Sequence, residues 1–167
     1  MISSKYLSVW SLFKKEVLRF YKVGIQTIIG PAISSLLFLA VFNLALGKSV
    51  MTINNVSFAT FIAPGLIMMT ILQNSFANSA SSIGQAKFQG NIVDILMAPL
   101  NNLELTIGYV GGSLIRGLAC GFVTGLGIYI FIPFSFHSLS ALIFYSVMGS
   151  IMMGTLGTMV GIWADKW

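Results

Sequence analysis

The first long run without a charge reads VGIQTIIGPAISSLLFLAVFNLALG, residues 23–47, and lies between Lys22 and Lys48. An α-helix rises about 1.5 Å per residue, so about 20 such residues cross a hydrocarbon core about 30 Å thick. The basic segment before the run contains Glu16, and the run is too long for the apolar core of a cleaved signal peptide. We therefore predict a retained membrane span over residues 23–47.

Three further apolar stretches follow this run. Residues 49–57 are polar enough for a loop, and residues 133–138 contain the proline and serines of a turn. Between and beyond these breaks we predict membrane spans over residues 58–82, 105–132 and 139–164.

The composition supports a membrane protein and excludes a soluble enzyme. Of the 167 residues, 56% are apolar and only 8% are charged, whereas a soluble domain has about 25% charged residues. The spans use nearly the whole chain, so we predict a single membrane domain over residues 1–167 that is not catalytic by itself.

The sequence also lacks the motifs of a metal or nucleophile site. Cys120 and His137 are each the only residue of their type, and no His-Glu-x-x-His or Gly-x-Ser-x-Gly motif occurs. We expect no metal and no cofactor in this chain. We also expect no nucleic-acid partner, because the net charge of +5 comes mainly from residues before the first span.

The distribution of basic residues predicts the orientation. Cytoplasmic segments of membrane proteins retain lysine and arginine, which places the N-terminus and the end of the chain in the cytoplasm and Lys48 outside. The residues assigned to the cytoplasmic side are Lys5, Lys14, Lys15, Arg19, Lys22, Lys87 and Lys166.

Residues 1–22 show the spacing of an amphipathic helix. Lys15, Arg19 and Lys22 lie on the polar side of this helix. We predict that the apolar side enters the lipid interface while the lysines meet lipid phosphates. The alternative is a flanking segment whose charges only set the topology. The apolar side consists of Tyr6, Val9, Trp10, Phe13, Val17 and Phe20.

Polar residues inside the spans are candidates for a translocation path. Gln73, Asn74 and Asn78 lie in the second span and Arg116 in the third. Such residues normally face the bundle interior or a cavity. The alternatives are hydrogen bonds between helices for the amides, and for Arg116 a side chain that reaches back to lipid phosphate.

Glycines at four-residue spacing predict close helix contacts, because small residues let helix backbones approach in lipid. The alternative is the general frequency of glycine in membrane helices. The glycines concerned are Gly108, Gly112, Gly117, Gly121 and Gly125, with Gly157 and Gly161 later in the chain.

The segment between the second and third spans, residues 83–104, is unusually apolar for a loop. Ile92, Ile95 and Leu96 share one face of a predicted short helix that Asn91 is placed to cap and Pro99 ends. From spacing alone, this helix either docks in a groove of a partner protein or lies on lipid.

Several stretches, taken in order, resemble the integral membrane subunits of ATP-binding-cassette (ABC) exporters of the type-2 permease class. Together with the basic N-terminus they cover nearly the whole chain. They are FIAPGLIMMT (61–70), NSFANS (74–79), KFQG (87–90), DILMAPL (94–100), Glu104 and GGSLIRG (111–117).

The resemblance implies that the segment from about residue 87 to 99 is a coupling helix that docks on a separate ABC ATPase subunit. It also implies a second permease copy, in a bacterial plasma or inner membrane, with ATP and Mg²⁺ bound by the ATPase. The residues expected to couple are Phe88, Gln89, Gly90, Asp94, Ile95, Leu96 and Pro99.

The expected fold is therefore an all-α polytopic helical bundle with four transmembrane helices, an N-terminal interfacial helix and a short cytoplasmic coupling helix. Permeases of this class usually have six spans, and this sequence ends after the fourth predicted one. The expected function is ATP-driven export through a permease subunit. The alternative is a truncated membrane scaffold, or a relic of such a permease, that does not transport. A small channel ranks last, because Arg116 is the only charge within the spans.

Overall fold

A computed structural model describes residues 2–22, 24–45, 52–53, 56–132 and 138–164 of the chain. The ends of the first predicted span, residues 23, 46 and 47, and most of the predicted turn, residues 133–137, lie outside this description. The helices are α1 Ile2–Lys22, α2 Gly24–Ala45, α3 Phe58–Phe88, α4 Ile92–Met97, α5 Asn102–Phe131 and α6 Leu139–Trp163, and the strands are β1 Thr52–Ile53 and β2 Val56–Ser57.

Four of the helices are long and apolar enough to cross a membrane. The segments concerned are Gly24–Phe42 in α2, Phe58–Phe88 in α3, Asn102–Phe131 in α5 and Ser140–Trp163 in α6. The prediction of an all-α membrane bundle with four transmembrane helices is confirmed.

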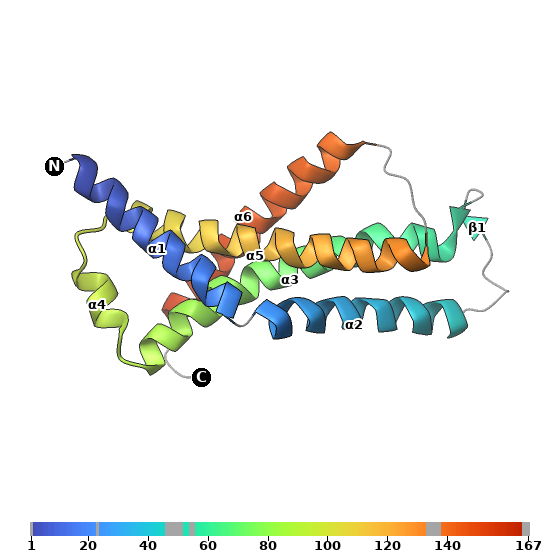
Figure 1. Ribbon diagram of the computed structural model, residues 1–167, viewed down its shortest axis with the longest axis horizontal. Coiled ribbons are helices and arrows are strands. Elements are labelled where there is room, and N and C mark those ends of the chain that lie inside the picture. Colours follow the sequence, from blue (N-terminus) through green and yellow to red (C-terminus); the bar gives the residue numbers. More distant parts are fainter. Residues whose placement is uncertain (1, 23, 46–51, 54–55, 133–137, 165–167) are drawn as a thin grey trace.

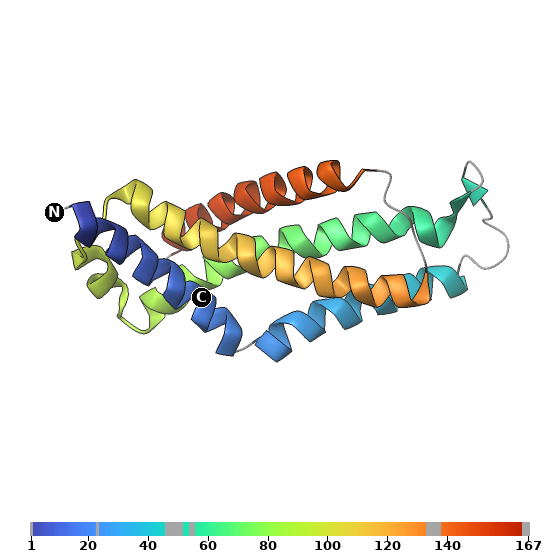
Figure 2. The same cartoon turned by 45° about the horizontal axis from the view of Figure 1, so that its top comes forward.

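Helix α3 lies at the centre of the bundle and packs along both α5 and α6. Helix α2 covers α5 and α3, and α1 crosses the first half of α5 (Figures 1 and 2). The N-terminus and α4 lie at one end of the bundle, and the two strands lie at the opposite end (Figure 1).

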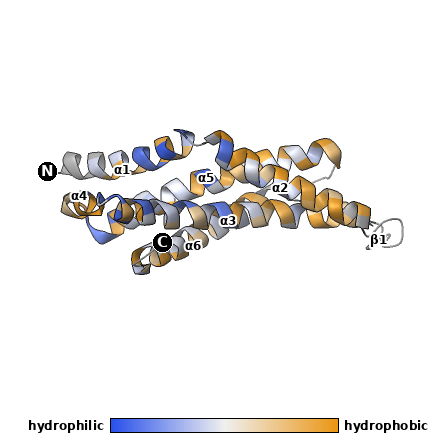
Figure 3. Cartoon of the chain, turned by 90° about the horizontal axis from the view of Figure 1, so that it is seen from below, coloured by the Kyte–Doolittle hydropathy of each residue, from blue (hydrophilic) through white to orange (hydrophobic). Residues whose placement is uncertain are grey.

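The outer surface of the bundle is apolar, and small polar side chains are buried inside it beside apolar ones. Large apolar side chains cover the outer surface, as with Ile25 on α2, which is 80% exposed. Apolar colours dominate the spanning parts of the helices in Figure 3, and polar colours gather toward the end that carries α1 and α4. This arrangement suits a hydrocarbon surrounding, where buried small polar residues can pack and hydrogen-bond between helices. The fully enclosed polar side chains include Ser75, Asn78, Ser79, Ser113, Thr124 and Ser150.

Two apolar clusters fix the helices at the two ends of the bundle. One joins α2, α3 and α5 through Leu39, Ile67 and Ile128. The other joins α1, α3 and α5 through Leu12, Ile83 and Tyr109. Helix α1 is therefore packed on the bundle and does not contact only lipid.

The two strands were not predicted, because residues 49–57 were expected to form a loop. Thr52 pairs with Ser57 and Ile53 with Val56 in an antiparallel arrangement. Strands of two residues are too short to show the alternating pattern by which a strand is recognised in a sequence.

Helix α3 continues six residues beyond the predicted span, so the connection to α5 is shorter than the predicted segment 83–104. The ammonium group of Lys87 donates to the carbonyl oxygens of Ile162 (2.5 Å) and Ala164 (2.9 Å) at the end of α6. A cation is stabilised at a helix C-terminus. The charge of Lys87 is therefore accommodated by the end of α6, and α3 can continue through this residue.

Helix α5 begins three residues earlier than predicted, at a capping box. The Asn101 side chain accepts from the backbone N–H of Asn102, and the backbone N–H of Asn101 donates to Glu104 at 2.8 Å. These bonds satisfy N–H groups that a helix start would otherwise leave unpaired.

Helix α1 turns a different side toward the protein than its apolar pattern indicates. Leu12 and Glu16 form its buried stripe, whereas Trp10 and Tyr21 are exposed. Arg19, which was predicted to lie on the polar side with Lys15 and Lys22, reaches inward to α3.

Candidate functional site

An exposed apolar surface lies on the connection between α3 and α5. Of the seven predicted coupling residues, only Ile95 is partly buried, and Phe88, Gln89, Gly90, Asp94, Leu96 and Pro99 are exposed. The surface lies at the same end of the bundle as the N-terminus (Figure 1).

The face of α4 differs from the predicted one. Ile92 and Ile95 are partly buried, so they do not share an open face with Leu96. The open residues are Phe88 (86% exposed), Val93, Leu96 (67%) and Met97 (79%). We call these four residues the α4 surface. Asn91 precedes α4 but its side chain makes no capping bond to the helix, so its predicted capping role is not observed.

A left-handed glycine sets the direction of α4. Gly90 follows Gln89, the residue that caps the end of α3, with φ of +74°, and its N–H donates to the Lys87 carbonyl at 3.1 Å. Glycine adopts this conformation without steric cost and ends many helices in this way. The turn at Gly90 thus separates α4 from α3.

Replacing Gly90 with alanine should destabilise this turn. A Cβ at this position meets nothing within 4 Å, so the expected cost of about 1–2 kcal/mol comes from the left-handed backbone alone. Amide hydrogen exchange over residues 89–97 should accelerate in Gly90→Ala and change less in Gly90→Asn, because asparagine tolerates this conformation. Equal exchange in both variants and the wild type would show that the turn does not hold α4.

A second group of polar residues lies where α1 meets α3 and α5. Glu16 is 1% exposed, and its two carboxylate oxygens accept from Ser82 Oγ at 2.7 Å and Arg19 Nη2 at 3.2 Å. The same Nη2 donates to the carbonyl oxygen of Asn78 at 2.9 Å and to its Oδ1 at 3.1 Å. Helix α1 is therefore tied to α3 by hydrogen bonds from a partly buried ion pair.

Arg116 approaches the same amide from α5. Its Nη1 lies 3.5 Å from Asn78 Oδ1, at the limit of a hydrogen bond. Arg116, Asn78 and Arg19 line a pocket of about 320 Å³ that is partly open to the surroundings. We call this the two-arginine pocket.

The residues predicted for a translocation path do not form one surface. Asn78 and Arg116 come together in the two-arginine pocket. Asn74 is buried but donates to the Thr70 carbonyl of its own helix at 2.9 Å, and Gln73 lies on the exposed side of α3.

The predicted packing glycines lie against neighbouring helices. A Cβ on Gly108 would lie 2.6 Å from Leu12 Cδ2, and one on Gly112 would lie 2.6 Å from Glu16 Cβ. These two glycines form the groove in which α1 lies. Gly117 and Gly121 face α3, where a Cβ would collide with Ser75 and Ile71 respectively, whereas Gly125 has only an ordinary contact with Ile67.

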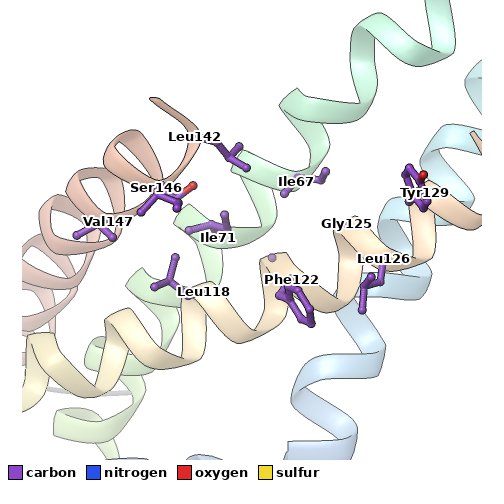
Figure 4. Close-up of a pocket in the computed structure, with 12 residues that line it drawn as sticks. Ile67, Ile71, Leu118, Phe122, Gly125, Leu126, Tyr129, Leu142, Ser146 and Val147 are labelled. Carbon is purple, nitrogen blue, oxygen red and sulfur yellow. The ribbon is translucent and has the colours of Figure 1, made fainter. Parts of the chain in front are cut away.

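An apolar cleft of about 550 Å³ opens between α3, α5 and α6. Figure 4 shows Ile67 and Ile71 from α3, Phe122 and Tyr129 from α5, and Leu142 from α6 around it. None of the four residues predicted for a translocation path lines this cleft.

The sequence analysis did not assign a site role to Glu16, Ser82, Gln26 or Gln85. Glu16 carried the clearest signal, because it is the only acidic residue among residues 1–22 and lies one turn after Leu12. An acidic residue in line with the buried residues of a basic helix indicates a buried hydrogen-bond or ion-pair partner for its carboxylate. No group of three or more His, Cys, Asp or Glu residues that would suit a metal ion lies in the described ranges.

The sequence profile of the ABC-2 type transporter family matches residues 8–166. The chain belongs to this family. The ABC-2 assignment agrees with the resemblance noted from the ordered motifs and with the four membrane-spanning helices, which make the chain a multi-pass membrane protein.

Curated relatives of this ABC-2 chain carry the name inner membrane transport permease YadH. Those from Escherichia coli K12, Escherichia coli O157:H7 and Shigella flexneri are each 34% identical to it over 165 residues. The alignment covers 98% of this chain and 64% of each relative, so the chain spans just under two thirds of their length. No solved structure matches this chain.

Proposed function

We propose that this chain is the membrane subunit of an ABC exporter, which couples ATP hydrolysis by a separate ATPase subunit to export of a substrate. ATP and Mg²⁺ would bind to that ATPase and not to this chain. The observation that carries the proposal is the α4 surface, since four large apolar side chains exposed at one end of a membrane bundle are typical of a docking surface.

The proposal includes an orientation and an assembly. The basic residues of α1 favour a cytoplasmic N-terminus, and α4 lies at the same end of the bundle, where a cytoplasmic ATPase can reach it. We further propose that two copies of the permease act together with the ATPase. The membership in the ABC-2 family supports both statements.

A co-purification experiment tests the docking surface. The chain is expressed in membranes with the candidate ABC ATPase from its own genome and captured through a tag. Leu96→Asp should reduce the captured ATPase about tenfold or more, because a central apolar contact typically contributes 2 kcal/mol or more to an interface. Leu96 is 67% exposed, so the bundle itself should remain folded.

Leu103→Asp provides a matched control. Leu103 has similar exposure, 72%, but lies in the first turn of α5 outside the α4 surface. Melting temperatures without the ATPase separate folding from docking. Undiminished capture by Leu96→Asp would contradict the assignment of this surface. Absence of any capture by the wild-type chain would instead favour a scaffold that does not transport.

A further inference from the structure

The two-arginine pocket carries an excess positive charge. Arg19 is balanced by Glu16, which forms the ion pair at 3.2 Å. Arg116 forms no ion pair within the described parts of the chain. Glu16 accepts from Ser82 and Arg19, and among the described residues it forms no hydrogen bond or ion pair with Arg116. One guanidinium charge therefore lacks a protein counter-charge.

Several buried donors of the pocket also lack partners. Asn78 is 0% exposed, and its Nδ2 has no hydrogen-bond acceptor within the described residues. The Nε atoms of Arg19 and Arg116 are likewise buried and unbonded there. Buried donors are normally hydrogen-bonded, and each orphaned one costs about 1–3 kcal/mol. The three residues that carry these unpartnered donors all line the pocket.

The pocket lies beside the junction of α1 and α2, where residues of both helices line it. Gln26, on its rim, is in the first turn of the first membrane helix, directly after the basic helix α1. Ser81 and Gln85 contribute polar groups from α3. The volume of about 320 Å³ is at the lower end of the range for small-ligand pockets, about 300–1,000 Å³.

We propose that the two-arginine pocket binds a phosphoryl anion, held by the guanidinium groups of Arg19 and Arg116. Guanidinium groups bind phosphate oxygens through paired hydrogen bonds, and basic pockets between membrane helices are typical sites for anionic headgroups. A phosphoryl group supplies both features that the pocket lacks, a negative charge and several acceptor oxygens. The site needs no ATPase, so its occupancy is independent of the proposed transport function.

Binding to the purified full chain in neutral detergent tests the proposal. The probes are phosphatidylglycerol, diacylglycerol as the lipid without a phosphate, and inorganic phosphate. Native mass spectrometry counts bound lipid, and competition by inorganic phosphate distinguishes the two sources of the anion. We expect phosphatidylglycerol to bind and diacylglycerol not to bind. Displacement by millimolar phosphate would assign the site to a soluble anion, and retention of the lipid would assign it to a headgroup.

Variants show whether binding occurs in this pocket. Arg116→Gln should weaken the affinity about tenfold or more, the effect of one charged hydrogen-bonding group. Lys14→Gln removes the same charge from an exposed position on α1 and should leave the affinity unchanged. Gln26 lies at an exposed position on the rim, and Gln26→Leu should weaken binding severalfold. This variant replaces Arg116→Gln as the test if Arg116→Gln does not fold.

Two results would overturn the proposal. One is equal binding of phosphatidylglycerol and diacylglycerol with no effect of inorganic phosphate. The other is an equal loss of affinity in Arg116→Gln and Lys14→Gln, or no loss in Arg116→Gln and Gln26→Leu. Either result would mean that the attraction is general and not located in the two-arginine pocket.

Discussion

Replacing Glu16 with alanine is expected to lower the free energy of unfolding by about 2–4 kcal/mol. The change removes the acceptor of Ser82 Oγ and the counter-charge of Arg19. Arg19 would then remain next to α3 without a carboxylate. Its side chain is 24% exposed, so water offsets part of the loss and the cost should stay below that of a fully buried pair.

Two companion variants separate the contributions. Glu16→Gln keeps an acceptor for Ser82 but removes the charge, and should be intermediate. Lys15→Ala, at the neighbouring exposed position, should change stability by less than about 0.5 kcal/mol. Equilibrium unfolding in mixed micelles measures the three values. Equal losses in Glu16→Ala and Lys15→Ala would show that the buried ion pair does not hold α1 on the bundle.

The membrane helices could be predicted because one physical requirement determines them. A helix in hydrocarbon cannot carry many charges, so the intervals between charges locate the spans. The ends were less accurate for the same reason. In the sequence, Lys87 marks the end of a charge-free interval. In the structure α3 continues past it, because its ammonium group binds the carbonyl oxygens at the end of α6. Such a tertiary partner is not visible in the sequence of α3.

The side of α1 that faces the protein was not predictable from α1 alone. Its apolar residues fit either a lipid surface or a helix surface, and the choice depends on the groove at Gly108 and Gly112 of α5. The exposed face of α4 was missed for a related reason. Six residues from Ile92 to Met97 make fewer than two turns, so the neighbouring bundle decides which side is covered.

Replacing Gly157 with alanine should be among the most destabilising single-methyl changes in the bundle. A Cβ on this residue of α6 would lie 2.5 Å from the backbone carbonyl oxygen of Phe76 on α3. A backbone atom in the middle of a helix cannot rotate away as a side chain can, so α6 must move from α3. Overpacking of this kind costs about 1–3 kcal/mol, occasionally more, and we expect the upper part of that range.

A series of glycine variants tests whether close helix approach is the cause. A Cβ on Gly161 would lie 3.0 Å from Ile83 Cβ, so Gly161→Ala should cost less stability than Gly157→Ala. A Cβ on Gly30 meets nothing within 4 Å, so Gly30→Ala should be neutral or slightly stabilising. Unfolding in mixed micelles should therefore rank the losses as Gly157, then Gly161, then Gly30. Helix association in lipid depends on packing of this kind, since lipid chains are as apolar as the side chains they replace. An equal effect at all three positions would mean that the glycines act through helix propensity and not through contact.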